Sequence, residues 1–179
     1  MASVFGHAIA AAAIGNTSGT LSKSVKFWIL AIFCCCIPDA DVATFKFGIP
    51  YEHPFGHRGF THSLFFAFVL ALIIKTTFYY SVSLWSKKGI TILIMFFVLT
   101  ASHGVLDAMT NGGRGIAFFG PFDNTRHFLP WREIVVSPMS AAKFFGEWGI
   151  RVIKSELMWI GIPSAAFMLL TSLFRKARA

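Results

Sequence analysis

Residues 89–109, Gly-Ile-Thr-Ile-Leu-Ile-Met-Phe-Phe-Val-Leu-Thr-Ala-Ser-His-Gly-Val-Leu-Asp-Ala-Met, decide the fold class of this chain. An apolar run of this length is sufficient for a helix to cross the ~30 Å hydrocarbon core of a membrane. Lys87 and Lys88 precede the run, whereas His103 and Asp107 lie near its end. We therefore expect a membrane helix with one basic end and one end that carries an imidazole and a carboxylate.

The composition of the whole chain agrees with an integral membrane protein. Of the 179 residues, 55% are hydrophobic and 13% are charged, which is more apolar and less charged than is usual for a soluble domain. Besides Gly89–Met109, the sequence predicts a full span from Leu64 through Lys75 to Trp85. A third full span is expected from about Val152 to Phe174, with a kink at Pro163.

Two other apolar segments are shorter. Val4–Ile14 and Phe27–Ile37 contain eleven residues each, about 16 Å of helix, which cannot cross the hydrocarbon core alone. The first segment has neither a basic flank nor a small-residue cleavage site, so we interpret it as mature structure and not as a signal peptide. No repeat or shift in composition divides the chain. The prediction is an all-α integral membrane helical bundle with about three full spans and two short or half-spanning helices, in a single domain of residues 1–179.

The basic residues predict the orientation of the bundle. If the spans alternate, one side of the membrane receives basic residues without Asp or Glu, and the positive-inside rule makes that side the cytoplasm. This set is Lys23, Lys26, Lys75, Lys87, Lys88, Arg175, Lys176 and Arg178. The other side receives all eight acidic residues together with Lys46, Arg58, Arg114, Arg126, Arg132, Lys143, Arg151 and Lys154. The net charge of +8 therefore favours topology signalling and contact with anionic membrane lipid over direct binding of nucleic acid.

His103 and Asp107 form the clearest chemical motif. Residues four positions apart project from the same face of a helix, so this pair can bind one ion. A neutral histidine that is hydrogen-bonded to an aspartate inside the bundle explains the pair alone equally well. Because the helix begins at Lys87 and Lys88, the pair falls on the extracytoplasmic side.

The turn Ile-Pro-Asp-Ala-Asp at residues 37–41 brings two carboxylates to the same side. Pro38 is expected to end the preceding apolar helix, which places Asp39 and Asp41 just after its C-terminal end. A solvated turn after a helix gives the same pattern, so the turn alone does not identify a metal site.

The block Gly-His-Arg-Gly-Phe-Thr-His-Ser at residues 56–63 contributes two histidines around an arginine. Thr61 is an N-cap candidate for the next helix, and this assignment places His62 in the first turn. The glycines on both sides of Arg58 allow a close approach of the backbone. Two histidines at the start of a membrane helix favour a ligand site over simple packing.

These segments together predict a metal site at the extracytoplasmic ends of the helices. Ionisable groups at membrane depth are costly and are retained mainly where they bind something. Imidazole with carboxylate suits zinc, and also manganese or iron, so we expect one or two divalent ions, zinc first. Cys34, Cys35 and Cys36 point in different directions on a helix and are interpreted as small core residues. The candidate metal ligands are His7, Asp39, Asp41, His57, His62, His103 and Asp107.

Three arginines and one further histidine lie in the extracytoplasmic loops. The guanidinium fork suits bidentate contact with phosphate, so Arg58, Arg114 and Arg126 are candidates for binding a phosphoester substrate. Ordinary interface arginines or partners of loop carboxylates explain each of them singly as well. His127 is a candidate for a further ligand or for the general acid that protonates the leaving group.

The motifs quoted above resemble the YdjM-like family of bacterial inner-membrane proteins. The likeness lies in Pro38–Asp41, the block His57–Ser63 and the His103–Asp107 pair, and it extends over most of the chain, including His7. The resemblance implies a metal-dependent hydrolase of the inner (cytoplasmic) membrane, and that family is distantly similar to zinc-dependent phospholipase C. The ligands implied are His7, Asp39 or Asp41, His62, His103 and Asp107, with His57 and Arg58 in ligation or phosphate binding.

One departure from the phospholipases concerns the number of ions. They have a further His-x-x-x-Glu pair late in the fold, whereas His127 is followed four residues later by Trp131. One or two ions therefore fit better than three. In the implied mechanism Asp39 or Asp107 accepts a proton from water, and Arg58 stabilises charge in the transition state. The substrate class we expect is a phosphoester of a membrane lipid or a lipid-linked molecule.

A non-enzymatic alternative stays open. The chain would then be a membrane protein with a structural metal site that binds a regulatory protein partner through its basic cytoplasmic ends, an interaction that the resemblance also implies. A phosphatase of the phosphatidate type is disfavoured because its lysine-arginine and Ser-Gly-His signatures are missing from the sequence. A transporter is disfavoured because the motifs gather on one face of the membrane and do not follow a pathway.

Overall fold

The fold was obtained as a computed structural model that describes residues 1–177. Within this range the chain is all-helical, and its extended segments form only isolated bridges, Thr110 with Ile134 and Ile116 with His127. The α-helices are α1 (Val4–Asn16), α2 (Val25–Cys36), α3 (Leu64–Phe78), α4 (Lys87–Ala108), α5 (Ala141–Phe144), α6 (Glu147–Glu156) and α7 (Ile162–Lys176). Short helical turns connect them at η1 (Leu21–Lys23), η2 (Ile37–Phe47), η3 (Phe60–His62) and η4 (Leu157–Gly161).

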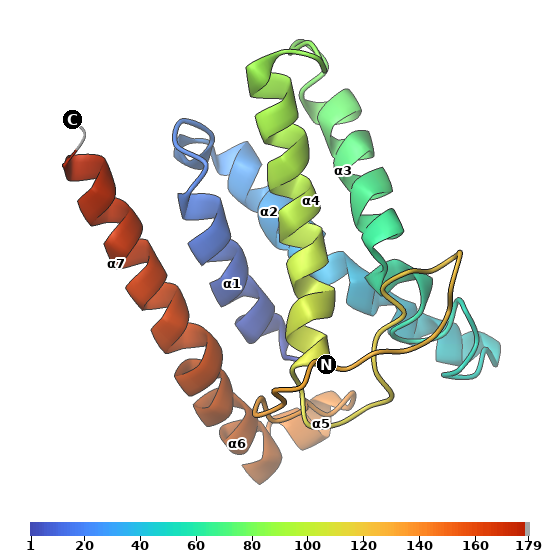
Figure 1. Cartoon of the computed structure of the whole chain (residues 1–179). Coiled ribbons are helices and arrows are strands. Elements are labelled where there is room, and N and C mark those ends of the chain that lie inside the picture. The colour runs from blue at the N-terminus through green and yellow to red at the C-terminus, as the bar shows by residue number, and fades with distance from the viewer. Residues whose placement is uncertain (178–179) are drawn as a thin grey trace.

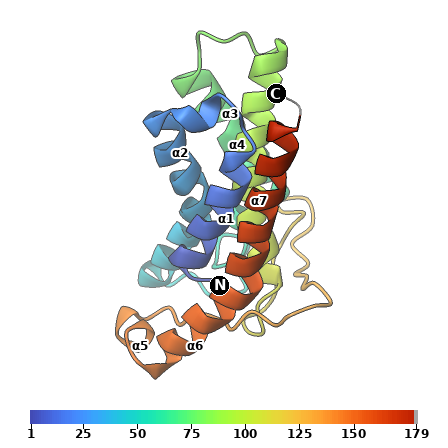
Figure 2. The same cartoon turned by 90° about the vertical axis from the view of Figure 1, so that its left-hand side faces the viewer.

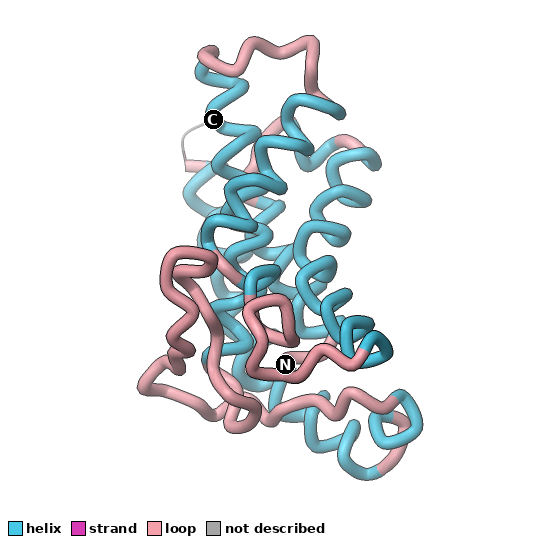
Figure 3. Tube along the Cα trace, turned by 90° about the vertical axis from the view of Figure 1, so that its right-hand side faces the viewer, coloured by secondary structure: helices cyan, strands magenta, loops and turns pink. Residues whose placement is uncertain are grey.

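The long helices run side by side along the length of the molecule (Figure 1). One end holds the α1–α2 connection, the α3–α4 connection and the C-terminal end of α7. The other end holds the N-terminus, α5, α6 and the longer loops, as the views turned by 90° to either side also show (Figures 2 and 3). We call these the basic end and the loop end.

Charge separates between the two ends as the sequence predicted. The basic end carries residues of η1, the first turns of α2 and α4, and the last turns of α3 and α7, namely Lys23, Lys26, Lys75, Lys87, Lys88, Arg175 and Lys176. Arg178, the remaining member of the predicted set, lies outside the described residues. The acidic residues belong to η2, the last turn of α4, α6 and the loops of the loop end.

Helix α4 is central to the bundle because it contacts α1, α2 and α3. Its apolar side, represented by Ile92, Phe96 and Leu99, is completely buried against Phe27 and neighbouring side chains of α2. These positions recur every three to four residues, which is the spacing of one helix face. The same face of α4 continues toward the loop end with His103 and Asp107. Because its apolar residues pack in the core, these two polar residues are buried as well.

The assignment of spans differs from the sequence prediction at two helices. Phe27–Ile37 was expected to be too short to cross a membrane, but α2 continues into η2, and Val25–Phe47 forms one apolar helical stretch of 23 residues. The prediction ended the helix at Pro38 because the residue before a proline is disfavoured in the α-helical region. Proline is tolerated in the first turn of a helical segment, and Pro38 lies at that position of η2, where the chain has already changed from α to 3-10 geometry.

The second difference concerns the predicted span Leu64–Trp85. Helix α3 has 15 residues and ends at Phe78, so it belongs with the shorter apolar helices. Helix α4 then begins after Ser86, whose hydroxyl oxygen accepts the N–H of Gly89 at 3.0 Å. The segment between is fixed by Lys75, whose ammonium group donates to the carbonyl of Val82. The overall prediction of three long apolar helices with shorter ones beside them is confirmed.

Helices α6 and α7 form the third long stretch, Glu147–Lys176. The irregularity predicted at Pro163 is present as the π-helical turn η4 directly before it, because a proline removes one helical hydrogen bond and its ring crowds the carbonyl four residues earlier. Only 11% of the most apolar window of this stretch is buried, against 39% for α4. The stretch therefore lies at the periphery of the bundle, as Figure 1 shows.

Candidate metal centre

Two groups of potential ligand atoms lie at the loop end of the bundle. The first, which we call the four-residue group, consists of Asp39, His62, His103 and Asp107. The second consists of Asp41, His57 and His62, so His62 belongs to both. In each group the ligand atoms all lie within 4.8 Å of one another. The segments that sequence analysis singled out therefore meet at one place.

The distances within the four-residue group suit a tetrahedral ion. Nε2 of His62 and Nε2 of His103 are 3.1 Å apart. Oδ1 of Asp39 lies 3.3 Å from Nε2 of His103 and 3.6 Å from Nε2 of His62, and Oδ2 of Asp107 lies 3.7 Å from Nε2 of His62. In a tetrahedral zinc site with bonds of about 2.0–2.1 Å, neighbouring ligand atoms are roughly 3.3 Å apart. The group therefore has room for one small ion at its centre.

Two outer contacts orient the histidines of this group. Nδ1 of His103 lies 2.7 Å from the carbonyl oxygen of Cys35, and Nδ1 of His62 lies 3.1 Å from Oδ2 of Asp41. The hydroxyl oxygen of Thr61 also lies 3.1 Å from Nδ1 of His62, and its proton is donated to Asp41, so the neighbours of both Nδ1 atoms are acceptors. Each Nδ1 therefore carries a proton. Both Nε2 atoms then present lone pairs to the centre, an arrangement that is typical of metal-ligating histidines.

Asp41 differs from Asp39 in the number of its hydrogen bonds. Its Oδ1 is 2.7 Å from Nδ1 of His57, and its Oδ2 accepts from the backbone N–H of Arg58 at 3.1 Å and from the hydroxyl of Thr61 at 2.6 Å. In contrast, neither oxygen of Asp39 has a hydrogen-bond partner within residues 1–177. The carboxylate of Asp39 is thus available to an ion, whereas that of Asp41 is already fully used.

The contact of Thr61 corrects one detail of the sequence prediction. Thr61 was expected to cap α3, but the cap is Ser63, whose hydroxyl oxygen accepts the N–H of Phe66 at 3.0 Å. His62 therefore lies in the separate turn η3 and not in the first turn of α3. This turn approaches α4 closely because Gly104 has no side chain, and a Cβ there would be 2.9 Å from the carbonyl oxygen of His62.

Arg58 is completely buried and its guanidinium is held by the protein. Nη1 donates to the carbonyl of Gly112 at 2.9 Å, Nη2 donates to the hydroxyl oxygen of Thr110 at 3.0 Å, and Nε lies 3.2 Å from Oδ2 of Asp107. The residue has a left-handed backbone conformation with φ of 66°, which is uncommon outside glycine and concentrates at functional sites. Arg58 therefore fixes Asp107 and the loop after α4.

The first residues of the chain complete the surroundings of Asp107. The backbone N–H of Ala2 donates to Oδ1 of Asp107 at 2.6 Å, and Nε2 of His7 lies 3.5 Å from the same oxygen. The ring of His7 stacks on that of His103 with centroids 3.8 Å apart, and neither ring nitrogen has a hydrogen-bond partner in the described part of the chain. His7 is thus a buried imidazole next to the four-residue group.

Glu156 holds α1 in this place, and sequence analysis missed it. Its carboxylate accepts the hydroxyl of Ser3 at 2.5 Å and also the backbone N–H of Ser3, the N-cap of α1. A carboxylate is stabilised at a helix N-terminus by the free N–H groups and the helix dipole. The signal was present, because Glu156 is the acidic residue within the predicted apolar span Val152–Phe174.

The charges of the site favour a bound cation. Burial opposes protonation of His62, but the nearby carboxylates of Asp39 and Asp41 outweigh burial and raise the pKa of His62 to about 9. Burial lowers the pKa of His57, and its hydrogen bond with Asp41 only partly compensates. The carboxylates therefore stabilise a proton on His62 when no ion is bound, and a divalent ion would replace that proton and leave Nε2 free to ligate.

The other predicted site residues lie outside both groups. Arg114 is exposed and forms an ion pair with Glu52. Arg126 is half-buried and its guanidinium donates to the carbonyls of Tyr51 and His57 at 2.8 and 2.9 Å. His127 is exposed, its ring packs edge-on against Phe119, and its backbone bridges to Ile116. These three side chains support the loops, and their roles in binding and catalysis stay predictions.

The cysteines are free and two of them are core residues. Cys34 and Cys35 are completely buried, and Cys36 is partly buried at the end of α2. Their contribution to the site is the carbonyl oxygen of Cys35, which no side-chain pattern in the sequence can indicate.

Comparison with known proteins agrees with the motifs. The sequence profile described as YdjM inner membrane protein matches residues 1–179. The chain belongs to the YdjM inner membrane protein family. The Escherichia coli (strain K12) protein described as inner membrane protein YbcI is 37% identical over 169 residues, which cover 94% of this chain and 95% of that protein. No solved structure gives a significant match. The predicted family is therefore confirmed, as is the placement of this YdjM family member in the inner membrane.

Proposed function

We propose that this member of the YdjM family is a membrane-embedded metal-dependent hydrolase that acts on a phosphoester of a lipid or lipid-linked substrate at the extracytoplasmic face. One observation carries the proposal. Four ligand atoms from η2, η3 and α4 lie within 4.8 Å of one another, and buried atoms among them, such as the oxygens of Asp39, have no hydrogen-bond partner within residues 1–177. Unsatisfied buried polar atoms are costly, so this cost is offset where an ion binds.

The residues that would hold the ion are Asp39, His62, His103 and Asp107. Two nitrogen and two oxygen ligands suit zinc, with manganese or iron as alternatives. His62 is shared with the second group, and His57 and Asp41 are hydrogen-bonded to each other, so one ion in the four-residue group fits the contacts better than two. A divalent ion supplies Lewis acidity and lowers the pKa of water, which are the two requirements for hydrolysis of a phosphoester.

The remaining side chains of the site then have definite tasks. Both oxygens of Asp39 lack a hydrogen-bond partner within residues 1–177, so the one that does not hold the ion is the candidate to accept a proton from water. Asp107 is held at both oxygens, because Oδ1 accepts the N–H of Ala2 and Oδ2 is paired with Arg58. These contacts keep Oδ2 close to Nε2 of His62. The cationic charge of Arg58 lies close enough to stabilise negative charge that develops at the centre.

The positive-inside rule supports the orientation. The basic end collects lysines and arginines from η1, α2, α3, α4 and α7, so it belongs to the cytoplasm. The metal centre at the opposite end then faces the extracytoplasmic side, where it would meet membrane lipids of the outer leaflet.

A hydrolysis assay tests this proposal. Purified full-length protein is stripped with a chelator, reloaded with zinc or manganese, and incubated with a panel of phospholipids and lipid phosphates while released phosphate and head groups are quantified. We expect hydrolysis that depends on the added metal and is lost in Asp39→Asn but kept in His53→Ala, which changes an exposed histidine outside both groups. Metal binding without any metal-dependent product across the panel would contradict the hydrolase assignment.

The basic end supports a second candidate function. A polar depression there is lined by Ser18, Thr20, Lys87 and Lys88, so we propose that an acidic regulatory protein could contact it and that the metal site would then be structural. In that case Lys87→Glu with Lys88→Glu would abolish partner capture from membranes while Asp39→Asn would not. The opposite pattern favours the enzyme.

A further inference from the structure

An apolar groove opens between α1 and α2 near the metal centre. It has a volume of about 570 Å³, and Val4 of α1 and Ile32 of α2 lie on its two walls, with Met139 at its loop end. Apart from Asp39 and Cys36, the residues that line it have hydrocarbon or thioether side chains. Because α2 belongs to a candidate span, the groove lies at the depth of the bilayer.

Asp39 is the point at which the groove meets the four-residue group. Its side chain is 10% exposed, whereas those of His62, His103 and Asp107 are completely buried. Asp39 is also the member of the group that lines the groove. Both carboxylate oxygens of Asp39 are buried, so the side chain of Asp39 forms the wall between the groove and the metal centre. A molecule that reaches this wall through the groove lies among hydrocarbon side chains.

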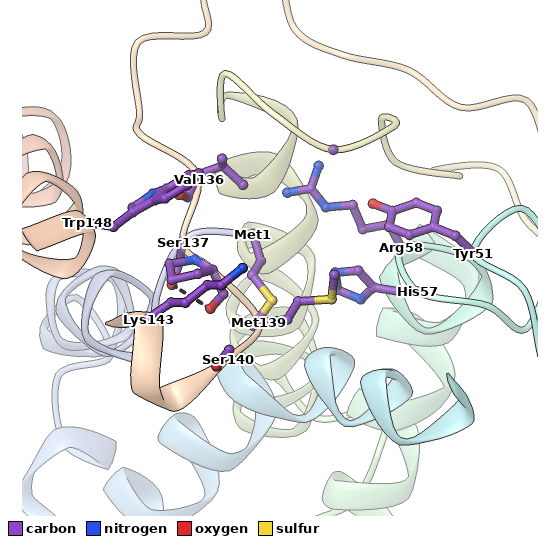
Figure 4. A pocket seen from close by; sticks show the side chains of 12 residues that line it. Met1, Tyr51, His57, Arg58, Val136, Ser137, Met139, Ser140, Lys143 and Trp148 are labelled. Carbon is purple, nitrogen blue, oxygen red and sulfur yellow. Dashed lines mark hydrogen bonds between the residues drawn. The ribbon is translucent and has the colours of Figure 1, made fainter. Parts of the chain in front are cut away.

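A second cavity adjoins the groove on the other side of Met139, which lines both. Its volume is about 390 Å³. Figure 4 shows Lys143 across the cavity from His57 and Arg58, with Met139 between them. Among the residues that the structure describes, the lining contains no Asp or Glu, and the guanidinium of Arg58 is already paired with Asp107, so the ammonium group of Lys143 is the free positive charge that complements an anion.

We propose that the groove holds an acyl chain of a phospholipid and that the adjoining cavity holds its anionic headgroup, which places the phosphoester beside Asp39. The inference rests on the proposed function and adds the route by which the substrate arrives. A phospholipid has the two parts that the two spaces fit, hydrocarbon and anion, whereas a water-soluble phosphoester would leave the groove unfilled. Lys143, and not Arg114 or Arg126, is then the residue that selects the headgroup.

Photo-labelling tests the groove without any turnover. Full-length protein in nanodiscs receives phosphatidylglycerol with a diazirine in its acyl chain, and the labelled peptides are mapped by mass spectrometry with and without metal. We expect labels concentrated at Val4, Ile32 and Met139 in both states. Ile32→Trp and Val4→Trp fill the groove from opposite walls and should each remove this labelling. Ile29→Trp is the matched control, because Ile29 is exposed on the same face of α2 one turn outside the groove.

Two results would overturn the inference. Even labelling of exposed apolar residues such as Phe68 of α3 and Leu169 of α7 would show that lipid does not prefer the groove. Unchanged labelling in both groove-filling variants would show the same. The headgroup cavity is tested with a variant of Lys143. Lys143→Glu should lower labelling by phosphatidylglycerol but not by a diacylglycerol with the same chain.

Failure of the proposed function can be distinguished from failure of this inference. It would appear as absent hydrolysis while labelling of the groove persists.

Discussion

The aspartates of the Pro38–Asp41 turn are two positions apart but have different surroundings. Asp39 has free carboxylate oxygens beside two histidine nitrogens, whereas Asp41 accepts hydrogen bonds from the Arg58 backbone and Thr61. The sequence alone could not assign different roles to them, because the spacing of the two aspartates does not reveal which one accepts hydrogen bonds from the neighbouring loop. Their contacts predict a ligand at Asp39 and a positioning residue at Asp41.

Asparagine substitutions distinguish these two roles. Asp39→Asn removes a charged ligand, so we expect bound zinc to be lost. Asp41→Asn should keep the site but weaken zinc affinity by roughly 10–100-fold, as is usual when an outer contact of a ligating histidine is removed. A competition titration against a chromophoric chelator measures both, with Asp123→Asn, at an exposed position, as the control. A larger loss in Asp41→Asn than in Asp39→Asn would reverse the assignment.

Gly113 lies directly against the guanidinium of Arg58 and leaves no room for a side chain. It has φ of 88°, and a Cβ at this position would clash with Nη1 of Arg58. Gly113→Ala should therefore lower both the melting temperature and the zinc affinity, because the guanidinium would move away from Asp107. Gly19→Ala is the matched control, since Gly19 also has positive φ, 63°, but a Cβ there would meet nothing within 4 Å. Equal effects of the two changes on zinc affinity would mean that backbone strain alone is responsible.

At the scale of elements, periodicity predicted the buried face of α4 but not the lengths of its neighbours. The spacing of Phe96, His103 and Asp107 on one face is a local property of a helix, so the sequence indicates it directly. Whether the chain continues past Pro38 or stops at Phe78 depends on contacts outside the apolar pattern, such as the hydrogen bond from Lys75 to the carbonyl of Val82. The same reason explains the Thr61 error, because Asp41 takes the hydroxyl that would otherwise cap α3.

Glu156 links the peripheral stretch of α6 and α7 to the metal centre through α1. Glu156→Ala would leave the N–H and hydroxyl of Ser3 without their buried acceptor, which costs about 1–3 kcal/mol of folding free energy. We expect a lower melting temperature and weaker zinc binding, since the N–H of Ala2 would no longer be held at Asp107. Thermal unfolding with and without zinc measures both, and the exposed Glu147→Ala serves as the control. Unchanged zinc affinity in a destabilised Glu156→Ala protein would limit Glu156 to a structural role.

At the scale of the whole molecule, the separation of charge predicts the topology. A green fluorescent protein fused to the C-terminus should fluoresce, and alkaline phosphatase fused there should be inactive, because the basic end is expected in the cytoplasm. Alkaline phosphatase inserted after the exposed Asn124 in the loop between α4 and α5 should be active. The reverse activities would place the metal centre in the cytoplasm and rule out an extracytoplasmic substrate.

The candidate site was predictable as a set of residues but not as a coordination sphere. Costly ionisable groups at the ends of apolar segments indicated His7, Asp39, His62, His103 and Asp107, and these do meet. The supporting contacts come from main-chain atoms and from residues distant in sequence, such as the Cys35 carbonyl. Such contacts depend on how the whole bundle packs, and residue types and spacing do not encode them locally.

The most direct test of the metal centre is the metal content of the purified protein. Elemental mass spectrometry on full-length protein without a histidine tag, prepared in detergent, would compare wild type with His103→Ala, Asp107→Ala and the exposed control His53→Ala. We predict near-stoichiometric divalent metal in wild type and His53→Ala, and its loss in the other two variants while circular dichroism still reports a folded helical protein. Absence of bound metal from wild type, even after reconstitution with zinc, manganese and iron, would contradict the account.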